Sequence, residues 1–274
     1  MGTVASIGYR HIIVEATGPV AYVTMNRPEK RNALSVEHME ELIAAFRAIG
    51  ESGAAVAILR GNGPAFCSGH DLNEMIGRDL DFYRHEFDVC TVLMETIQAI
   101  RQPVIAQVHA VATAAGCQLV ASCDLVVAAE EARFATPGVK IGLFCSTPMV
   151  ALTRAIGRKK ALEMLLTGDP ISAQEALAAG LVNRVVPAAE LAAETETLAA
   201  RIAAASPTVV SLGKQAFYHQ VELSQADAYT YAKECMSQNA LLADAQEGMC
   251  AFLQKRQPTW QQGSRGAGEQ RSRD

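Results

Sequence analysis

Two segments of small residues could present backbone amide groups to a ligand. Residues 65–72 contain Gly69, and residues 112–118 contain Ala114 and Ala115 followed by Gly116. Small side chains let a backbone approach a bound molecule closely. Each segment precedes a pattern typical of a helix, whose first amide groups have no partner within that helix. Two such amides aimed at one oxygen would form an oxyanion hole.

Both segments also have a purely structural interpretation. Residues 65–72 fit a tight turn in which Asp71 caps the following helix. The small residues of 112–118 fit close packing of a helix against a sheet. Residue spacing alone does not separate these interpretations from a ligand site.

A third segment, residues 133–148, carries potential nucleophiles in an irregular stretch marked by proline and glycine. Long loops of this kind often line functional sites. Cys145 and Ser146 could attack a carbonyl carbon, but any activating partner must come from elsewhere in the fold. The 7 cysteines include no Cys-x-x-Cys pair, which favours free thiols in a reducing compartment over disulfides or a metal site.

The polar loop 26–32 concentrates positive charge in Arg27, Lys30 and Arg31. The whole chain of 274 residues has a formal net charge of −5, which argues against a nucleic-acid-binding protein. Half of the residues are hydrophobic and 19% are charged, which excludes a disordered chain. No apolar stretch reaches the ~18 residues of a membrane span and no secretory signal is visible, so we expect a cytoplasmic protein.

The elements around these segments predict an α/β core. Residues 10–16 and 19–25 are apolar runs separated by Thr-Gly, the pattern of a hairpin. Further strands are expected at 54–59, 104–108 and 124–129, with helices from a Ser35 cap to Gly50 and over 80–101. Strands that alternate with helices pair in parallel and are buried on both faces.

The chain becomes mainly helical after about residue 148. Helices are expected at 149–157, 159–167 and 172–179, with Gly180 in the left-handed position that ends the last of them. A last strand at 182–186 and several helices over 188–253 follow. We divide the chain into a core domain at 1–200, a helical region at 201–260 and a disordered tail at 261–274, and find no internal sequence repeat.

Together these segments resemble the crotonase (enoyl-CoA hydratase/isomerase) superfamily over residues 12–260. The matching motifs occur in the family's order at residues 26–34, 66–72, 117–124, 134–142, 166–168, 171–173 and 247–252. Residues 68–72, 112–118 and 142–148 are most similar to one branch, the enoyl-CoA hydratase domain-containing protein 3 group. The resemblance implies a spiral of ββα units with a C-terminal helical region that builds trimers or dimers of trimers.

The resemblance also implies an acyl-CoA thioester ligand, with coenzyme A as part of the substrate and no tightly bound cofactor. It assigns the two oxyanion-hole amides to His70 and Ala115. It places coenzyme A near Arg27, Lys30, Arg31 and the backbone of Ala33 and Leu34, with Ala65 and Phe66 close to the adenine. The three cations of the 26–32 loop could otherwise be merely solvated.

The chain departs from the hydratases of this family at both catalytic glutamate positions, which are Gln118 and Gly138 here. A glutamine can orient water but cannot act as an acid or base near neutral pH, and a glycine has no side chain. The two-glutamate mechanism therefore lacks both its acid and its base. On sequence grounds, Gln118→Glu with Gly138→Glu is expected to install some hydratase activity.

Other side chains could take over proton transfer. Histidine titrates near neutral pH, so His70 would serve if its ring faces the site; alternatively only its amide matters. Cys117 at a helix start could be an activated thiol or a packed one. Glu130 and Glu131 could supply a carboxylate, although exposure is the usual case for acids.

Two functions remain open from the sequence. The chain could be an enzyme of fatty-acid metabolism that acts on an acyl-CoA by slow hydration as a lyase, by thioester hydrolysis or by decarboxylation. Decarboxylation tolerates the missing glutamates best, because it needs enolate stabilisation more than a strong base. The alternative is a non-catalytic acyl-CoA-binding or regulatory protein on the same scaffold.

Overall fold

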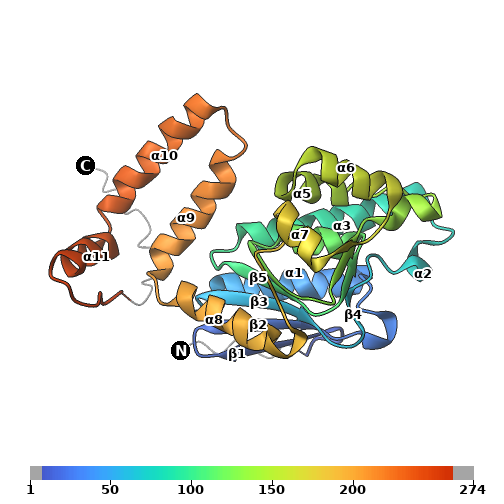
Figure 1. Cartoon of the computed structure of the whole chain (residues 1–274), viewed down its shortest axis with the longest axis horizontal. Coiled ribbons are helices and arrows are strands. Elements are labelled where there is room, and N and C mark those ends of the chain that lie inside the picture. Colours follow the sequence, from blue (N-terminus) through green and yellow to red (C-terminus); the bar gives the residue numbers. More distant parts are fainter. Residues whose placement is uncertain (1–7, 262–274) are drawn as a thin grey trace, which may run out of the picture. The chain divides into compact units, whose positions relative to one another are not determined.

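The computed structural model describes residues 8–261, which divide into two compact units between Ile202 and Ala203. Sheets with covering helices make up the first unit, and the second is helical (Figure 1). Gln261, expected in a disordered tail, donates its backbone N–H to Asp244 Oδ1 at 2.8 Å. The rest of that predicted tail, residues 262–274, lies outside the described residues.

The first sheet has six strands, and all neighbouring pairs but one are parallel. The exception is the predicted N-terminal hairpin, in which Ile12 pairs with Met25 and Thr17 with Val20. The expected strands are confirmed, and the central ones are buried apolar runs. In spatial order the strands are β1 (Ile12–Thr17), β2 (Val20–Met25), β3 (Val56–Gly61), β5 (Val104–Val108), β7 (Leu125–Ala129) and β10 (Arg184–Val186).

A second sheet of four short strands was not apparent in the sequence. Strands of two or three residues give too little periodicity to be recognised. Their order is β4 (Ala65–Cys67), β6 (Val111–Thr113), β8 (Arg133–Ala135) and β9 (Ile171–Ser172). The first three are parallel to one another, so the loops after them leave from the same edge of the sheet.

Successive ββα units build the core. Each places one strand in the first sheet, the next strand in the second sheet, and then a helix, as in β3–β4–α2 and β5–β6–α4. The β3–β4 unit carries α2 (Leu72–Met75) and the long α3 (Leu80–Ala99), whereas the β5–β6 unit carries only α4 (Ala115–Ser122). These unequal lengths explain why a structural repeat leaves no regular repeat in the sequence. The expected spiral of ββα units is confirmed.

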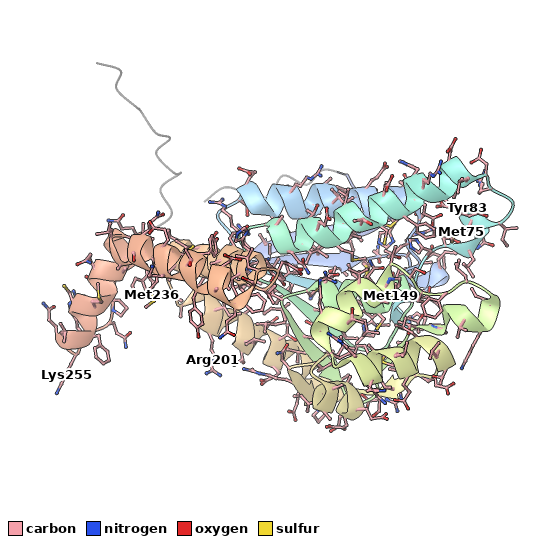
Figure 2. The ribbon with its side chains drawn as sticks, turned by 90° about the horizontal axis from the view of Figure 1, so that it is seen from above. Met75, Tyr83, Met149, Arg201, Met236 and Lys255 are labelled. Atoms are coloured by element: carbon pink, nitrogen blue, oxygen red, sulfur yellow. The ribbon has the colours of Figure 1, made fainter. Side chains whose placement is uncertain are left out.

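Helices α1 (Val36–Glu51) and α3 lie side by side (Figures 1 and 2). The Ser35 hydroxyl caps α1 by accepting the His38 N–H at 3.2 Å, and Asp79 caps α3 in the same way. Phe46 of α1 and Leu93 of α3 are fully buried in the common core.

The remaining helices of the first unit follow the expected order. Gly180 ends α7 with φ 92°, the left-handed conformation predicted for it. The helices are α5 (Pro148–Ala155), α6 (Arg158–Thr167), α7 (Ala173–Ala179) and α8 (Leu191–Ala203), with single turns η1 (Pro28–Lys30), η2 (Pro137–Ile141) and η3 (Ala188–Glu190).

The second unit consists of α9 (Pro207–Gln220), α10 (Gln225–Ala240) and α11 (Ala243–Leu253). Asp244 fixes its two ends by accepting hydrogen bonds from the Ser206 hydroxyl and the Gln261 amide. Large apolar side chains remain exposed on these helices, among them Phe217, Met236, Phe252 and Leu253. None of the helices within residues 8–261 is long and apolar enough to cross a membrane.

Helix α4 begins very close to strand β4 at Gly116, the second residue of α4. A Cβ atom at this position would lie 2.2 Å from the carbonyl oxygen of Cys67 at the end of β4. Atoms cannot approach so closely, so only glycine lets α4 begin directly beside β4.

We expect Gly116→Ala to lower the free energy of unfolding by about 1–3 kcal/mol or more, the usual cost of overpacking. Denaturant unfolding followed by circular dichroism measures this change. Gly213→Ala in α9 is the matched control, because nothing lies within 4 Å of its added Cβ. A Gly116→Ala variant as stable as the wild type would show that α4 can move away from β4 at no cost.

Candidate functional site

Three loops meet at one cavity of about 580 Å³. They follow β4, β6 and β8, whose carboxyl ends lie at the same edge of the second sheet. The first loop contributes His70, the second Ala115 and the third Gly138. The volume falls within the usual range of small-molecule sites. Parallel pairing of three short strands therefore collects segments that are far apart in the sequence.

Most of the cavity wall is apolar. Helix α2 supplies Leu72 and Met75, α3 supplies Phe87, and the loop before α5 supplies Leu143 and Phe144. The Tyr83 hydroxyl donates to the Met75 carbonyl at 2.7 Å and so ties α2 to α3 (Figure 2). Three cations also line the cavity: Lys30, Arg31 and Lys140.

Two of the backbone N–H groups at the cavity for which residues 8–261 supply no hydrogen-bond acceptor lie in the small-residue loops. The first belongs to His70, whose neighbours are both engaged by Leu34: the Leu34 N–H donates to Gly69 O and the Asp71 N–H to Leu34 O. The second belongs to Ala115, the first residue of α4, where a helix leaves its amides unpaired. Both amides occupy the loops expected to form an oxyanion hole.

The two loops meet at a residue with a strained backbone, Ala114. Ala114 has φ 52° and ψ −121°, a conformation that costs a residue with a Cβ on the order of 1–3 kcal/mol. Gly69 faces it with φ 95°, and a Cβ there would lie 2.9 Å from the Ala114 Cβ. A hydrogen bond from the Ala114 N–H to Ala135 O at 2.9 Å fixes the strained residue to β8.

Arg27 is placed differently from its expected contact with coenzyme A. Its guanidinium donates to the Ala33 carbonyl at 2.7 Å and pairs with Asp71 at 3.2 Å, with both side chains buried. Asp71 caps α2 as expected. Burial opposes ionisation of Asp71, but hydrogen bonds from Asn73 and Arg27 hold the pKa of this carboxyl below its usual range. Arg27 therefore positions the loop and is not free to bind a phosphate.

Lys30 and Arg31 agree better with a ligand-binding role, because both are exposed at the cavity. Ala33 also lines the cavity, but its carbonyl already accepts from Arg27 and from His38. Leu34 is fully buried, and its backbone N–H and carbonyl are both used in the bridge around His70. The Leu34 N–H is therefore not available to a ligand, and a backbone contact of Leu34 with coenzyme A stays a prediction.

Ala65 and Phe66, expected near an adenine, lie in β4 and are buried in the core rather than in the cavity wall. Their carbonyls accept from the Asn32 amide at 3.0 and 3.1 Å. Asn32 is fully buried and also accepts the Arg27 N–H at 2.9 Å, so it fixes the 26–32 loop to β4. This role was not expected from the sequence, because an asparagine that follows two cations is not a specific signal for it.

The thiols near the site are not activated nucleophiles. Burial raises the pKa of Cys117 to about 12, and burial also raises the pKa of Cys145. The interpretation of Cys117 as an activated thiol is therefore wrong, because desolvation outweighs its place near a helix start. Glu130 and Glu131 are exposed and do not line the cavity.

Gln118 and Gly138 occupy very different surroundings. The Gln118 side chain is buried, with Oε1 3.9 Å from Cys90 Sγ of α3, and it does not line the cavity. Gly138 does line the cavity, in a loop closed by a 2.9 Å hydrogen bond from the Leu143 N–H to its carbonyl. A Cβ at Gly138 would lie 1.9 Å from the Leu143 carbonyl oxygen. No side chain fits there while this loop keeps its shape.

A carboxylate that the sequence analysis missed lies behind His70. Glu86 of α3 is fully buried, and its Oε1 is 3.1 Å from His70 Nδ1. The ring of Phe87 meets the imidazole edge-on, with ring centroids 5.5 Å apart. The sequence did contain a signal, because Glu86 falls four residues before Cys90 on the apolar stripe of the predicted helix. Within residues 8–261 no cluster of three or more His, Cys, Asp or Glu could hold a metal ion.

The family model for enoyl-CoA hydratase/isomerase matches residues 15–263. The chain belongs to the enoyl-CoA hydratase/isomerase family. It is 50% identical over 242 residues to human enoyl-CoA hydratase domain-containing protein 3, mitochondrial, covering 87% of this chain and 79% of the relative. This likeness confirms the branch that the motifs indicated.

Solved structures of two family members are similar to the whole fold. The crystal structure of the human domain-containing protein 3 has a TM-score of 0.90 at 47% identity, covering 92% of this chain and 100% of the other. An enoyl-CoA hydratase from Mycobacterium smegmatis has a TM-score of 0.90 at 45% identity, covering 92% and 99%.

The space around Gly138 leads to a prediction opposite to the one made from sequence. We expect Gln118→Glu with Gly138→Glu to gain no hydratase activity, because the Gly138 side chain would collide with the Leu143 carbonyl. We expect Gly138→Ala alone to lower the melting temperature, whereas Gly157→Ala, which meets nothing within 4 Å, should not. Thermal unfolding and loss of the enoyl absorbance of crotonyl-CoA are the measurements. Hydration by a folded double variant would contradict this account.

Proposed function

We propose that this protein binds an acyl-CoA thioester and stabilises negative charge on the thioester oxygen with the amides of His70 and Ala115. The observation that carries the proposal is the pair of acceptor-free N–H groups in an apolar cavity with cations at its wall. An enolate oxygen would accept from both amides, and one such donor is typically worth about 3 kcal/mol in a transition state.

Efficient hydration by two glutamates is not part of this proposal. Gln118 packs toward Cys90, and Gly138 has no room for a side chain. Reactions that need enolate stabilisation more than a strong base, such as decarboxylation of the acyl group, remain compatible with the site. The same two observations favour the alternative of a non-catalytic acyl-CoA-binding protein.

We further propose a homotrimer or a dimer of trimers built through the second unit. The large apolar side chains that α9–α11 leave exposed support this assembly, since monomeric proteins rarely expose so many together. A cytoplasmic location also remains our proposal, although the animal relatives of the same branch are named mitochondrial.

Titration calorimetry with butyryl-CoA tests binding, with coenzyme A and butyrate as comparison ligands. We expect butyryl-CoA to bind more tightly than either part. With crotonyl-CoA we expect hydration at least a hundredfold below an ordinary turnover of ~10 s⁻¹. No binding of any thioester would refute both the enzyme and the binding-protein proposals. Turnover near the ordinary value that survives Gln118→Ala would show that an efficient hydration mechanism is present.

The cations at the cavity make a separate prediction about affinity. We expect Lys30→Ala with Arg31→Ala to weaken butyryl-CoA binding about 2- to 30-fold and to flatten its salt dependence, because exposed ion pairs contribute about 0.2–1 kcal/mol each. Arg158→Ala with Lys159→Ala is the matched control, since these exposed cations of α6 do not line the cavity. Equal weakening by both pairs would mean that only overall charge matters.

A further inference from the structure

The pair formed by His70 and Glu86 has no structural explanation in the rest of the fold. Glu86 is fully buried, and the His70 side chain is 10% exposed. The 3.1 Å approach of Nδ1 to Oε1 suits an ion pair, but its angle does not make a well-aligned hydrogen bond. Neither carboxylate oxygen and neither ring nitrogen has another hydrogen-bond partner among residues 8–261.

Such a pair is poor at stabilising a fold. Taking a carboxylate out of water costs roughly several kcal/mol. Replacing a buried ion pair by apolar residues of similar volume often leaves the stability of a protein unchanged or raises it. The position of Glu86 on α3 is otherwise an apolar one, in line with Cys90, Leu93 and Ile97. A buried acid that meets an imidazole beside a cavity is instead typical of a functional site.

His70 is at the cavity wall, with both nitrogens of its ring buried beside it. His70 lines the cavity and carries one of the two acceptor-free amides, and Phe87 beside its ring lines the cavity too. Asp71, the neighbouring acid, is already paired with Arg27. The ring of His70 therefore has Glu86 as its charged partner among the described residues.

We propose that His70 and Glu86 form the acid–base pair of this site, in place of the two glutamates that the chain lacks. The proposal rests on the function proposed above, because it assumes a bound acyl-CoA. Glu86 is the positioning residue: the charge of its carboxylate beside Nδ1 favours a proton on that nitrogen and leaves Nε2 as the base. Because Nε2 is buried, the ring must shift toward the cavity to reach a substrate. His70 is the catalytic residue, in the arrangement by which a carboxylate orients a histidine in many enzymes.

The proton transfer balances without any co-reactant. Nε2 takes a proton from the α-carbon of the thioester, and the electron pair of that C–H bond becomes the enolate C=C bond. The carbonyl π electrons move to the oxygen, which accepts hydrogen bonds from the His70 and Ala115 amides. Return of a proton from Nε2 to the α-carbon restores the thioester, and in heavy water this returns deuterium.

Deuterium exchange into butyryl-CoA tests the pair without knowledge of the natural substrate. We expect the wild-type protein in D₂O to remove the α-proton signal, followed by NMR, faster than buffer alone. We expect His70→Gln and Glu86→Gln each to slow this exchange at least tenfold and to bind butyryl-CoA within threefold of the wild-type Kd. The matched controls are His85→Gln and Asp88→Asn, exposed neighbours on α3 that should exchange like the wild type.

The double variant separates catalysis from folding. His70→Gln with Glu86→Gln removes both members at once and leaves no unpaired buried charge, so it should fold even if Glu86→Gln alone is unstable. We expect its exchange rate to equal that of His70→Gln, because two residues that act as one unit are not additive.

The pH dependence supplies a readout that a merely structural role would not change. The pH profile of exchange should differ between the wild type and Glu86→Gln, because this change removes the carboxylate beside the imidazole. Cys90 of α3 interacts electrostatically with Glu86 and with Cys67 of β4, and burial raises the pKa of both thiols to about 12. The pKa of Asp71, next to His70 in the sequence, is lowered, so none of these three groups accounts for a change of the profile near neutral pH.

The outcomes distinguish this inference from the function on which it rests. Failure of butyryl-CoA to bind would refute the proposed function and the pair with it. Binding without exchange above the buffer rate, or wild-type exchange in folded His70→Gln and Glu86→Gln variants, would refute the pair alone.

Discussion

The structure depends on how closely helix α4 approaches strand β4. At Gly116 the distance to the Cys67 carbonyl leaves no space for a Cβ, and at Gly69 the same is true toward Ala114. These two contacts bring the ends of two ββα units together, although their sequences are more than forty residues apart. The strained Ala114 comes directly before Ala115, and Ala115 and His70 line the same cavity. Without glycine at both positions, neither the sheet edge nor the amide pair could form.

The proposed site depends on backbone amides rather than on side-chain acids at positions 118 and 138. The position of a backbone amide depends on loop geometry. Small residues of almost any kind preserve this geometry, provided that Gly69 and Gly116 remain. Side-chain acids depend on residue identity, and Gln118 and Gly138 lack them. The Gly138 loop has no room for a side chain, because the Leu143 carbonyl fills the space. Two buried carboxylates lie near the amides: Asp71 is paired with Arg27, and Glu86 of α3 lies beside His70.

The three cations of the 26–32 loop have different surroundings. Arg27, Lys30 and Arg31 look equivalent in the sequence, yet Arg27 is buried against Asp71 while the other two are exposed. Asn32 fixes the backbone of this loop to β4 by hydrogen bonds to the Arg27 N–H and the Ala65 carbonyl. Arg27 thus contacts the His70 loop through its ion pair with Asp71, whereas Lys30 and Arg31 remain exposed at the cavity.

The sequence by itself determined the α/β class, the main strands and helices, the helix caps at Ser35, Asp71 and Gly180, and the family. These features depend on local periodicity, on capping chemistry and on motifs in a fixed order. Only the tertiary structure decided which residues meet: the short strands of the second sheet, the burial of Arg27, Leu34 and Phe66, the lack of space at Gly138, and the pairing of Glu86 with His70. Each of these is a contact between segments distant in the chain, and no local pattern records the distance between two such segments.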